Sequence, residues 1–243
     1  MSKEFDKYET IGPDYHYRQI DKRFFRNFNA FLDARFLKLV EHVEKIAGDK
    51  KLKLLDVGSG DGVILYLVKK SLPKLELHGV DEVETALAVA RGKVPDAKIV
   101  QASAYKLPYP DETFDIVISS DVIEHLDKPE IMLGEIKRVA KRDAYIIVGT
   151  PIRRTKNPID PQHVDEFFPE DLLKMMSRYF KECTLSESHN LIPTLLYNAP
   201  TRSFINYRYL INFLSLFFNY NPFFAERRNK SEMFAYMYIV CKN

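Results

Sequence analysis

The chain has 243 residues, 46% of them hydrophobic, which is enough to bury a substantial core. Lysine and arginine together number 36 against 34 acidic residues, which gives a net charge of +2. This balance disfavours a protein built mainly to hold duplex nucleic acid, because such proteins carry a marked basic excess.

The two cysteines, Cys183 and Cys241, are far apart in the sequence. We expect them to be reduced thiols of a cytoplasmic protein rather than a disulfide framework, and their spacing is not that of a structural zinc site. The polar start, MSKEFDKYET, predicts no secretory signal. No run of 18 apolar residues predicts a membrane-spanning helix.

The N-terminal region predicts a long helix. After a polar stretch, apolar side chains recur on one helical face from residue 21 to residue 47, and Gly48 follows as a stop signal. We therefore expect residues 1–48 to form a helical cap.

A different rhythm follows, in which short apolar runs alternate with helical stretches. The predicted strands are Lys53–Val57, Leu75–Val80, Ala97–Gln101, Phe114–Ser119 and Ala144–Gly149. The predicted helices are Gly62–Ser71, Val83–Arg91, Pro129–Ala140 and Pro169–Phe180. Such alternation predicts an α/β fold with a Rossmann-like, doubly wound and mostly parallel sheet, in which ligands bind at the carboxyl ends of the strands.

The C-terminal region predicts two more strands, Glu182–Ser188 and Met233–Cys241, which bring the sheet to seven. The 40 residues between 191 and 230 are rich in Phe, Tyr, Leu and Asn and are too many for a plain loop. We expect a helical insertion there, and a main domain made of residues 49–190 and 231–243. The insertion could be a lid over an apolar acceptor, a membrane contact, a dimer interface or a hairpin packed on the N-terminal helix.

The stretch LLDVGSGDGV, residues 54–63, runs from a strand through a glycine turn into a helix. Gly58, Gly60 and Gly62 let a ligand approach the main chain closely. Dinucleotide sites place a pyrophosphate at such a turn, but the carboxylates of Asp56 and Asp61 would repel phosphate and attract an ammonium group. The turn therefore predicts a ligand with a cationic amine.

Asp81 ends the second predicted strand, 23 residues after Gly58, in the stretch HGVDE. A carboxylate at that place can accept hydrogen bonds from both hydroxyls of a ribose. A ribose and a cationic amine without a phosphate are features of S-adenosylmethionine, which we predict to be the cofactor.

Four stretches in order resemble the successive motifs of class I S-adenosylmethionine-dependent methyltransferases: LLDVGSGDG, HGVDE, QASAYKLPYPDETFDIVISSDVIEHL and AYIIVGTP. The likeness covers about residues 53–180. It is nearest to the broad, methyltransferase type 11-like group that acts on small molecules, quinones, lipids and sugars. The resemblance implies a small organic acceptor.

The resemblance also implies roles for individual residues. The residues that would shape the methionine pocket are Asp56, Gly58, Ser59, Gly60 and Gly62. Asp81 would hold the ribose, and Glu82 would line the adenine side. The residues that would contact the adenine are Ser103, where many members have Asp, and Ala104. Those beside the transferable methyl group would be Ser119 and Asp121.

Methyl transfer to a hydroxyl requires an aligned acceptor and removal of its proton. In DVIEHLDKP, Asp121, Glu124 and His125 fall on one helical turn and can share a face, so His125, with Asp121 beside it, could orient the acceptor or act as a base. Related quinone methyltransferases have an acid-x-x-Glu-His pattern that holds a divalent ion. We instead expect no metal here, with His125 packing the turn before Pro129.

The stretch DPQHVDEFFPEDL follows the fifth predicted strand. It resembles the His-x-x-Glu-Phe segment of family members that act on sugars, lipid-linked glycans and other envelope molecules. Because imidazole titrates near neutrality, His163 is a candidate general base, with Asp165 or Glu166 to orient it. The alternative is that His163 only hydrogen-bonds the loop and Glu166 caps the next helix.

Two basic segments are further candidates. In PIRRTKNP, Arg153, Arg154 and Lys156 can bind a phosphate or carboxylate of the acceptor, or form an ordinary basic loop. The stretch PDYHYRQIDKRFF resembles an entry segment in which Arg18 would pair with the carboxylate of the cofactor's methionine. Core packing of this segment is the alternative.

The sequence therefore predicts an enzyme that methylates a small organic acceptor, with a hydroxyl of a sugar, lipid-linked glycan, quinone or lipid favoured. The alternatives are methylation of RNA or protein, cofactor binding without catalysis, and a nicotinamide dehydrogenase. Nucleic acid is an unfavoured partner. A cytoplasmic location is expected, and peripheral membrane contact or a homodimer through residues 191–230 is left open.

Overall fold

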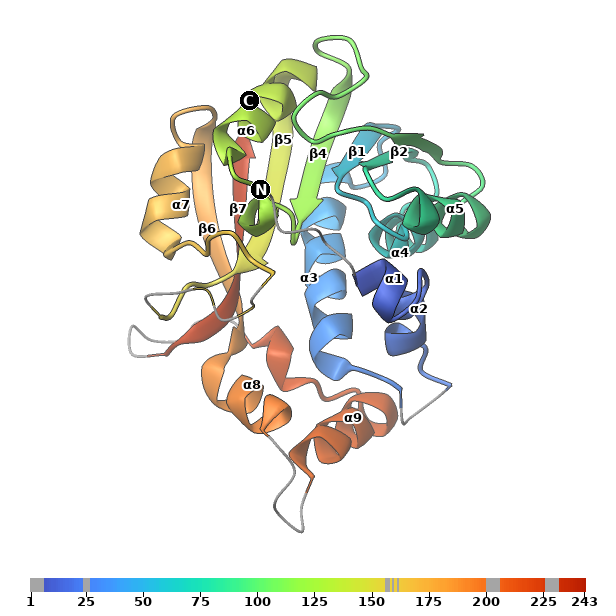
Figure 1. The fold of residues 1–243 in the computed structure, drawn as a ribbon, viewed down its shortest axis with the longest axis vertical. Coiled ribbons are helices and arrows are strands. Elements are labelled where there is room, and N and C mark those ends of the chain that lie inside the picture. The colour runs from blue at the N-terminus through green and yellow to red at the C-terminus, as the bar shows by residue number, and fades with distance from the viewer. Residues whose placement is uncertain are drawn as a thin grey trace.

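A seven-stranded sheet runs through the computed structural model, which describes residues 7–23, 27–155, 158, 160, 162–199, 206–225 and 232–243 (Figure 1). The strands are β1 Lys53–Val57, β2 Glu76–Asp81, β3 Lys98–Gln101, β4 Phe114–Ser120, β5 Ala140–Pro151, β6 Lys181–Asn190 and β7 Phe234–Lys242. Their order is β3-β2-β1-β4-β5-β7-β6. The first five pair in parallel, and β7 runs antiparallel between β5 and β6. The predicted Rossmann-like α/β fold is thereby confirmed.

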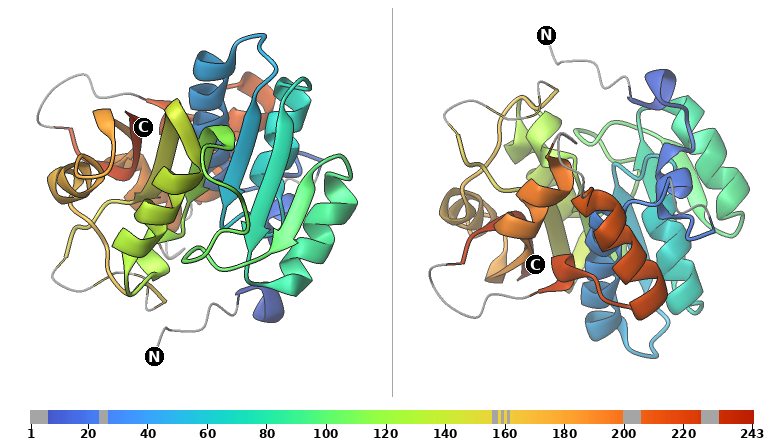
Figure 2. Two further views of the ribbon diagram at one scale, coloured as in Figure 1. Left: turned by 90° about the horizontal axis from the view of Figure 1, so that it is seen from above. Right: turned by 90° about the horizontal axis from the view of Figure 1, so that it is seen from below.

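Helices cover both faces of this sheet (Figure 2). They are α1 Lys7–Thr10, α2 Tyr15–Ile20, α3 Ala30–Ala47, α4 Val63–Ser71, α5 Glu84–Lys93, α6 Pro129–Val139, α7 Pro169–Met176, α8 Leu191–Asn198 and α9 Tyr207–Phe218, with the 3-10 turns η1 Ile123–His125 and η2 Pro222–Phe224. Side chains alternate along each strand, so Leu55 and Val57 of β1 pack with α6 and α7, whereas Leu54 packs with α3 and α4.

The carboxyl ends of β1, β2 and β4 meet at one edge of the sheet because these strands are parallel neighbours. The glycine turn follows β1, Asp81 closes β2, and Asp121 follows β4. The backbone N–H of Asp121 donates to the carbonyl of Gly149 on β5 at 3.0 Å, which fixes the turn after β4.

The N-terminal helix is shorter than its apolar pattern predicts. α3 begins at Ala30 because the side chain of Asn29 caps it, accepting a hydrogen bond from the backbone N–H of Leu32 at 3.1 Å. Residues 24–26 of the predicted helix lie outside the described residues. Gly48 ends the helix as expected, with a φ of 52°.

The predicted insertion is helical. α8 and α9 lie at the end of the molecule toward which the arrow of β4 points (Figure 1). Asn212 of α9 anchors this end to the start of α3: its Nδ2 donates to the carbonyl of Phe28 at 2.6 Å, and its Oδ1 accepts from the N–H of Ala30 at 3.2 Å. Among the described residues, we find no helix with the length and apolarity needed to cross a bilayer.

The expectation of two separate thiols is wrong, because Cys183 and Cys241 form a disulfide. They belong to β6 and β7, which are adjacent antiparallel strands, and the register that pairs Thr184 with Val240 places Cys183 opposite Cys241. Their Cα atoms are 4.1 Å apart although 58 positions separate them in the chain. Sequence spacing carried no signal of this pairing, since it depends on the order of strands in the sheet.

Candidate active site

A cavity of about 1400 Å³ opens at the carboxyl edge of the sheet. Its lining comes from the glycine turn, the ends of β2 and β4, η1, the loop after β5, the N-terminal helices and α8. Sites for one small ligand usually measure about 300–1000 Å³. This cavity therefore has room for a cofactor and an acceptor together.

The backbone conformation and the packing of the glycine turn both require glycine at positions 58 and 60. Gly58 and Gly60 have φ values of 78° and 50°, which L-residues rarely adopt. A Cβ on Gly58 would lie 2.1 Å from Cγ2 of Val122, and one on Gly60 would lie 1.8 Å from the hydroxyl of Tyr8. Gly58 and Ser59 line the cavity, whereas Gly60 and Gly62 do not.

Asp81 lines the cavity and also holds the glycine turn. Its carboxylate accepts the N–H of Gly60 at 2.8 Å and that of Val83 at 2.9 Å. Burial raises the pKa of this carboxyl group. Each carboxylate oxygen has further lone pairs, so Asp81 can also accept from ligand hydroxyls. Glu82 lines the cavity beside it.

The lining near the glycine turn is acidic. Asp61 is fully buried and contacts Nδ1 of His16 through Oδ1 at 3.1 Å, and both residues line the cavity with Asp81 and Glu82. A group of carboxylates suits an ammonium, a sulfonium and ribose hydroxyls, and repels a pyrophosphate. The site therefore fits S-adenosylmethionine rather than a dinucleotide.

Asp56 lies beneath the cavity, not in its wall. It is fully buried in β1, and neither of its carboxyl oxygens has a hydrogen-bond partner among the described residues. Burial, with the nearby charge of Asp81, raises its pKa to about 8. Asp56 would therefore influence the methionine pocket indirectly, from its buried position beneath the glycine turn, rather than by touching the cofactor.

Of the remaining residues predicted to bind the cofactor, some line the cavity and one does not. Ser103 and Ala104 line the cavity as expected. Ser119 does not: it is buried, and its hydroxyl donates to the carbonyl of Val57 at 2.9 Å, while its neighbour Ser120 reaches the cavity. Successive side chains of a strand point in opposite directions, so only one of these two neighbouring serines at the end of β4 can face the site.

Arg18 is not at the cavity, which corrects its predicted role. Its side chain is 49% exposed, pairs with Asp14 at 3.2 Å and donates to the carbonyl of Ile11. Arg35 of α3 instead reaches the site, where its Nη1 lies 3.0 Å from Oδ1 of Asp121. The sequence signal for Arg35 was weak, a charge beside the apolar face of a predicted helix.

Asp121 follows β4 in a left-handed backbone conformation, with a φ of 58°. Besides Arg35, it contacts the hydroxyl of Ser120, which donates to Oδ2 at 3.0 Å. Glu124, on the next turn, is 1% exposed and accepts from the hydroxyl of Thr150 at 2.9 Å. Burial and the neighbouring Asp121 raise the pKa of Glu124 to about 8.

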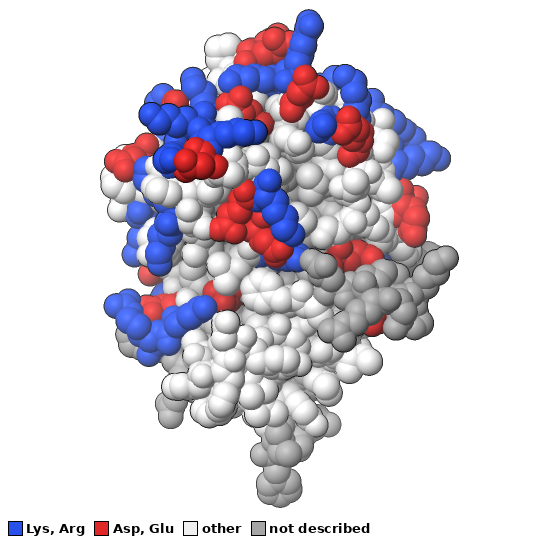
Figure 3. Space-filling model, turned by 180° about the vertical axis from the view of Figure 1, so that it is seen from behind, with Lys and Arg blue, Asp and Glu red and all other residues white. Residues whose placement is uncertain are grey.

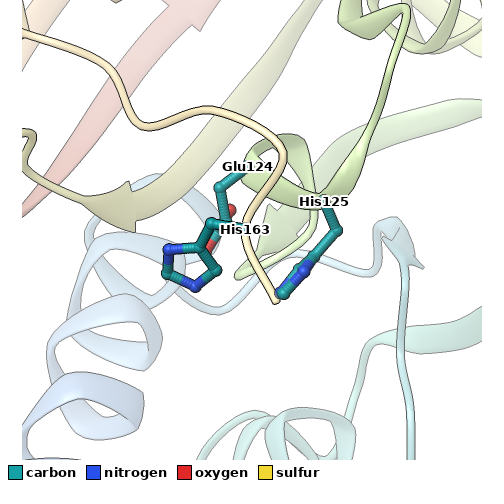
Figure 4. Close-up of side chains that lie close together, drawn as sticks. All are labelled: Glu124, His125 and His163. Carbon is teal, nitrogen blue, oxygen red and sulfur yellow. The ribbon is translucent and has the colours of Figure 1, made fainter. Parts of the chain in front are cut away.

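The loop after β5 brings His163 to Glu124 and His125 (Figure 4). The N–H of Val164 donates to the carbonyl of Glu124 at 2.8 Å and ties the loop to η1. His163 meets Glu166 through Nδ1 at 2.7 Å. His125 meets the carbonyl of Gln162 through Nδ1 at 3.1 Å, and burial lowers its pKa.

Glu124, His125 and His163 place potential ligand atoms within 4.8 Å of one another, so they could hold a transition-metal ion. This group differs from the acid-x-x-Glu-His pattern weighed in the sequence, because His163 joins it and Asp121 pairs with Arg35.

Arg154 lines the cavity, and burial lowers its pKa. Arg153 pairs with Asp165 at 2.9 Å, so Glu166, not Asp165, is the acid that orients His163. Lys156 lies outside the described residues.

Residues 55–148 match the family model described as a methyltransferase domain. This segment carries β1 to β4 and most of β5, with the glycine turn, Asp81 and Asp121. The chain contains a class I S-adenosylmethionine-dependent methyltransferase domain. Its cofactor is S-adenosylmethionine.

The chain is 38% identical over 105 residues to an uncharacterised methyltransferase of Schizosaccharomyces pombe, a match that covers 39% of this chain and 38% of the relative. It is 28% identical over 117 residues to the demethylmenaquinone methyltransferase of Thermotoga maritima, over 48% of this chain and 50% of the relative. The chain thus spans half or less of the length of these curated relatives.

Among solved structures, the chain resembles the protein in a complex with the Trm112 methyltransferase activator of Haloferax volcanii. The TM-score is 0.63, with 95% of this chain and 97% of that chain covered and 14% sequence identity. This likeness shows a shared fold.

Proposed function

We propose that this methyltransferase transfers a methyl group to a hydroxyl of an organic acceptor, namely a sugar, lipid-linked glycan, quinone or lipid. The observation that carries the proposal is the His163–Glu166 pair, 2.7 Å apart, in the cavity that Asp81 and the glycine turn also line. A hydroxyl acceptor requires such a base, whereas a carboxylate acceptor does not.

The cofactor-binding part of the proposal assigns one wall of the cavity. Asp81 would accept the ribose hydroxyls, Asp61 would balance the positive amine, and Ser103 and Ala104 would border the adenine. All of these residues line the cavity. The cofactor supplies an electrophilic methyl group on a sulfonium, so the protein has mainly to align the acceptor and exclude water.

The acceptor part assigns a second group of lining residues, which we call the acceptor wall. With its Nδ1 proton donated to Glu166, the imidazole of His163 would take the acceptor's hydroxyl proton at Nε2 as the new carbon–oxygen bond forms and the carbon–sulfur bond breaks. Nε2 lies 3.9 Å from Oδ2 of Asp160, whose negative charge would stabilise the imidazolium. His125 stays neutral near physiological pH, because burial lowers its pKa, and is suited to orient the acceptor. Asp121, held by Arg35, lines the same cavity.

The test compares His163→Ala with the unchanged protein in two measurements. Turnover is followed by mass spectrometry, as the gain of one CH₂ by molecules in lipid and glycan extracts. Cofactor affinity is measured by calorimetry. We expect turnover to fall by roughly 100-fold or more, because a general base contributes about that much, and affinity to stay the same.

The control is His42→Ala, which changes a histidine outside the cavity. Equal turnover in His163→Ala and the control would remove His163 as the base. Extracts that gain no CH₂ with any of the proteins would remove the proposed acceptor classes.

A further inference from the structure

Helix α9 lies at the surface and exposes large apolar side chains to solvent. Its buried residues are Ile211, Asn212 and Ser215, and Asn212 makes the hydrogen bonds that hold the helix to Phe28 and Ala30. Its exposed residues include Phe217 and Phe218, each 67% exposed. A helix on a water-facing surface normally has the reverse arrangement, with apolar residues toward the core.

Helix α8 adds to the same end of the molecule. Ile192 and Leu195 are 69% and 59% exposed, while Thr194 and Tyr197 are buried. Together the two helices present an apolar tip, whose exposed members are Ile192, Leu195, Leu196, Tyr207, Tyr209, Leu210, Phe213, Phe217, Phe218 and Tyr220. In Figure 3 the charged side chains gather over the upper part, and the lower end is white apart from residues outside the described ranges.

The charge of this segment has one sign. Residues 188–225 contain no Asp or Glu, but they include Arg208 and also Arg202, which lies outside the described residues. Arg208 is exposed beside Tyr197, whose ring centroid lies 5.4 Å from its guanidinium carbon. Apolar side chains flanked by Tyr and Arg, without acids, match the interface of a bilayer with anionic headgroups.

We propose that the apolar tip of α8 and α9 inserts into an anionic lipid bilayer and that the acceptor is an amphiphile drawn from it. A second copy of this chain is a poorer occupant, because a two-fold interface would set an acid-free surface against itself and bring like charges together. Anionic headgroups neutralise those cations, and the acyl region receives the exposed phenylalanines.

The link to the active site is α8 itself, and this part rests on the proposed function. Thr194 and Asn198 line the cavity, whereas Leu195 and Leu196, on the same helix, belong to the tip. An amphiphile can therefore place its polar head in the cavity while its chain stays along α8 in the lipid. This orientation explains why one helix carries both the apolar surface and part of the cavity lining.

The test measures binding of the full chain to sedimented vesicles, with neither cofactor nor acceptor added. The vesicles are phosphatidylcholine alone or an equimolar mixture with phosphatidylglycerol. We expect binding to the mixture, weakened by salt, and a loss of about tenfold or more in the double variant Phe217→Ser/Phe218→Ser. Both side chains are already exposed, so the fold should tolerate the change.

The matched control is Ile131→Ser, which removes an exposed apolar side chain of α6 and should bind vesicles like the unchanged protein. Binding that is absent, or unaltered in the Phe217/Phe218 variant, overturns the proposal. A dimer in solution that this variant dissociates would overturn it in favour of a second copy. Vesicle binding needs no methyl transfer, so it can succeed or fail independently of the proposed function.

Discussion

Asp81 combines two tasks in one side chain. Its carboxylate holds the backbone of Gly60 and Val83, and it also faces the cavity where the ribose would lie. A substitution that removes all its acceptor atoms would therefore loosen the glycine turn as well as the ligand contact. The amide of Asn keeps one acceptor oxygen and the size of the side chain.

We expect Asp81→Asn to weaken binding of S-adenosylmethionine by about 1–3 kcal/mol, because a ribose hydroxyl loses its charged acceptor. Calorimetry measures the affinity. The control is Asp96→Asn, which changes an acid outside the cavity whose side chain is 75% exposed. An affinity that Asp81→Asn leaves unchanged, in a folded protein, would contradict the placement of the ribose.

The cluster of Glu124, His125 and His163 yields a second residue-scale prediction. We expect Zn²⁺ to inhibit methyl transfer, because zinc takes imidazole and carboxylate ligands and a liganded His163 cannot accept a proton. Activity assays with added Zn²⁺, then with a chelator, would measure the inhibition and its reversal. Inhibition should weaken in His125→Ala, and activity that Zn²⁺ leaves untouched would contradict the predicted geometry.

Single residues were predictable where a motif marked them and not elsewhere. Asp81, Ser103 and His163 were found from their motifs and line the cavity. Arg35 was missed because it lies in a helix without a motif, and Arg18 was chosen wrongly because nearness in sequence to aromatic residues does not fix which way a short helix faces.

At the scale of elements, the pairing of β6 with β7 carries the covalent link between Cys183 and Cys241. The link spans 58 positions and closes a loop that contains α8 and α9. Cross-links of this kind stabilise mainly by restricting the unfolded chain.

We expect reduction of the disulfide to lower the free energy of unfolding by about 2–4 kcal/mol. Denaturant unfolding with and without reductant measures the change, and peptide mapping of unreduced protein should recover Cys183 and Cys241 in one linked product. The double variant Cys183→Ser/Cys241→Ser is the control and should not respond to reductant. A free-thiol count of two in the unreduced protein would refute the pairing.

The type and order of the helices and strands were predictable from the sequence, but their first and last residues were less so. β1 was predicted to the residue, since its apolar run is bounded by Lys53 and the glycine turn. β5 begins at Ala140 instead of Ala144, because Ala140 pairs with Phe114 of β4 and extends the strand beyond its apolar run. α3 is shorter than predicted since its start is set by the Asn29 cap.

Burial disfavours the charged forms of several acids in the molecule, among them Asp56 and Glu124. The pKa values of Asp56 and Glu124 are raised from 3.8 and 4.5 to about 8, chiefly by burial. The folded protein therefore retains protons that the unfolded chain releases at lower pH. Stability from these groups is fully present below the unfolded pKa values and is lost as pH rises toward 8.

We expect Asp56→Asn to reduce this dependence, because its amide does not ionise. Thermal unfolding at about pH 6 and about pH 9 measures the loss of stability with pH. The loss should be smaller in the variant than in the unchanged protein. Asp96→Asn, on the surface, should follow the unchanged protein. A variant that loses stability with pH as steeply as the unchanged protein would show that Asp56 is ionised throughout.

The overall architecture was predictable because alternating apolar runs and helical stretches leave few arrangements for a parallel sheet. The residues of the acceptor wall were harder to predict from the sequence. It depends on η1, the loop after β5 and α8 meeting in space, and Glu124, His163 and Thr194 come from three separate segments.

The ring closed by Cys183 and Cys241 has a practical consequence for mapping by limited proteolysis. A protease that cuts the chain once between α8 and α9 would leave both fragments joined through the sulfur bridge. Such a nicked molecule should migrate as one species on a denaturing gel until a thiol reagent is added and should then separate into two bands.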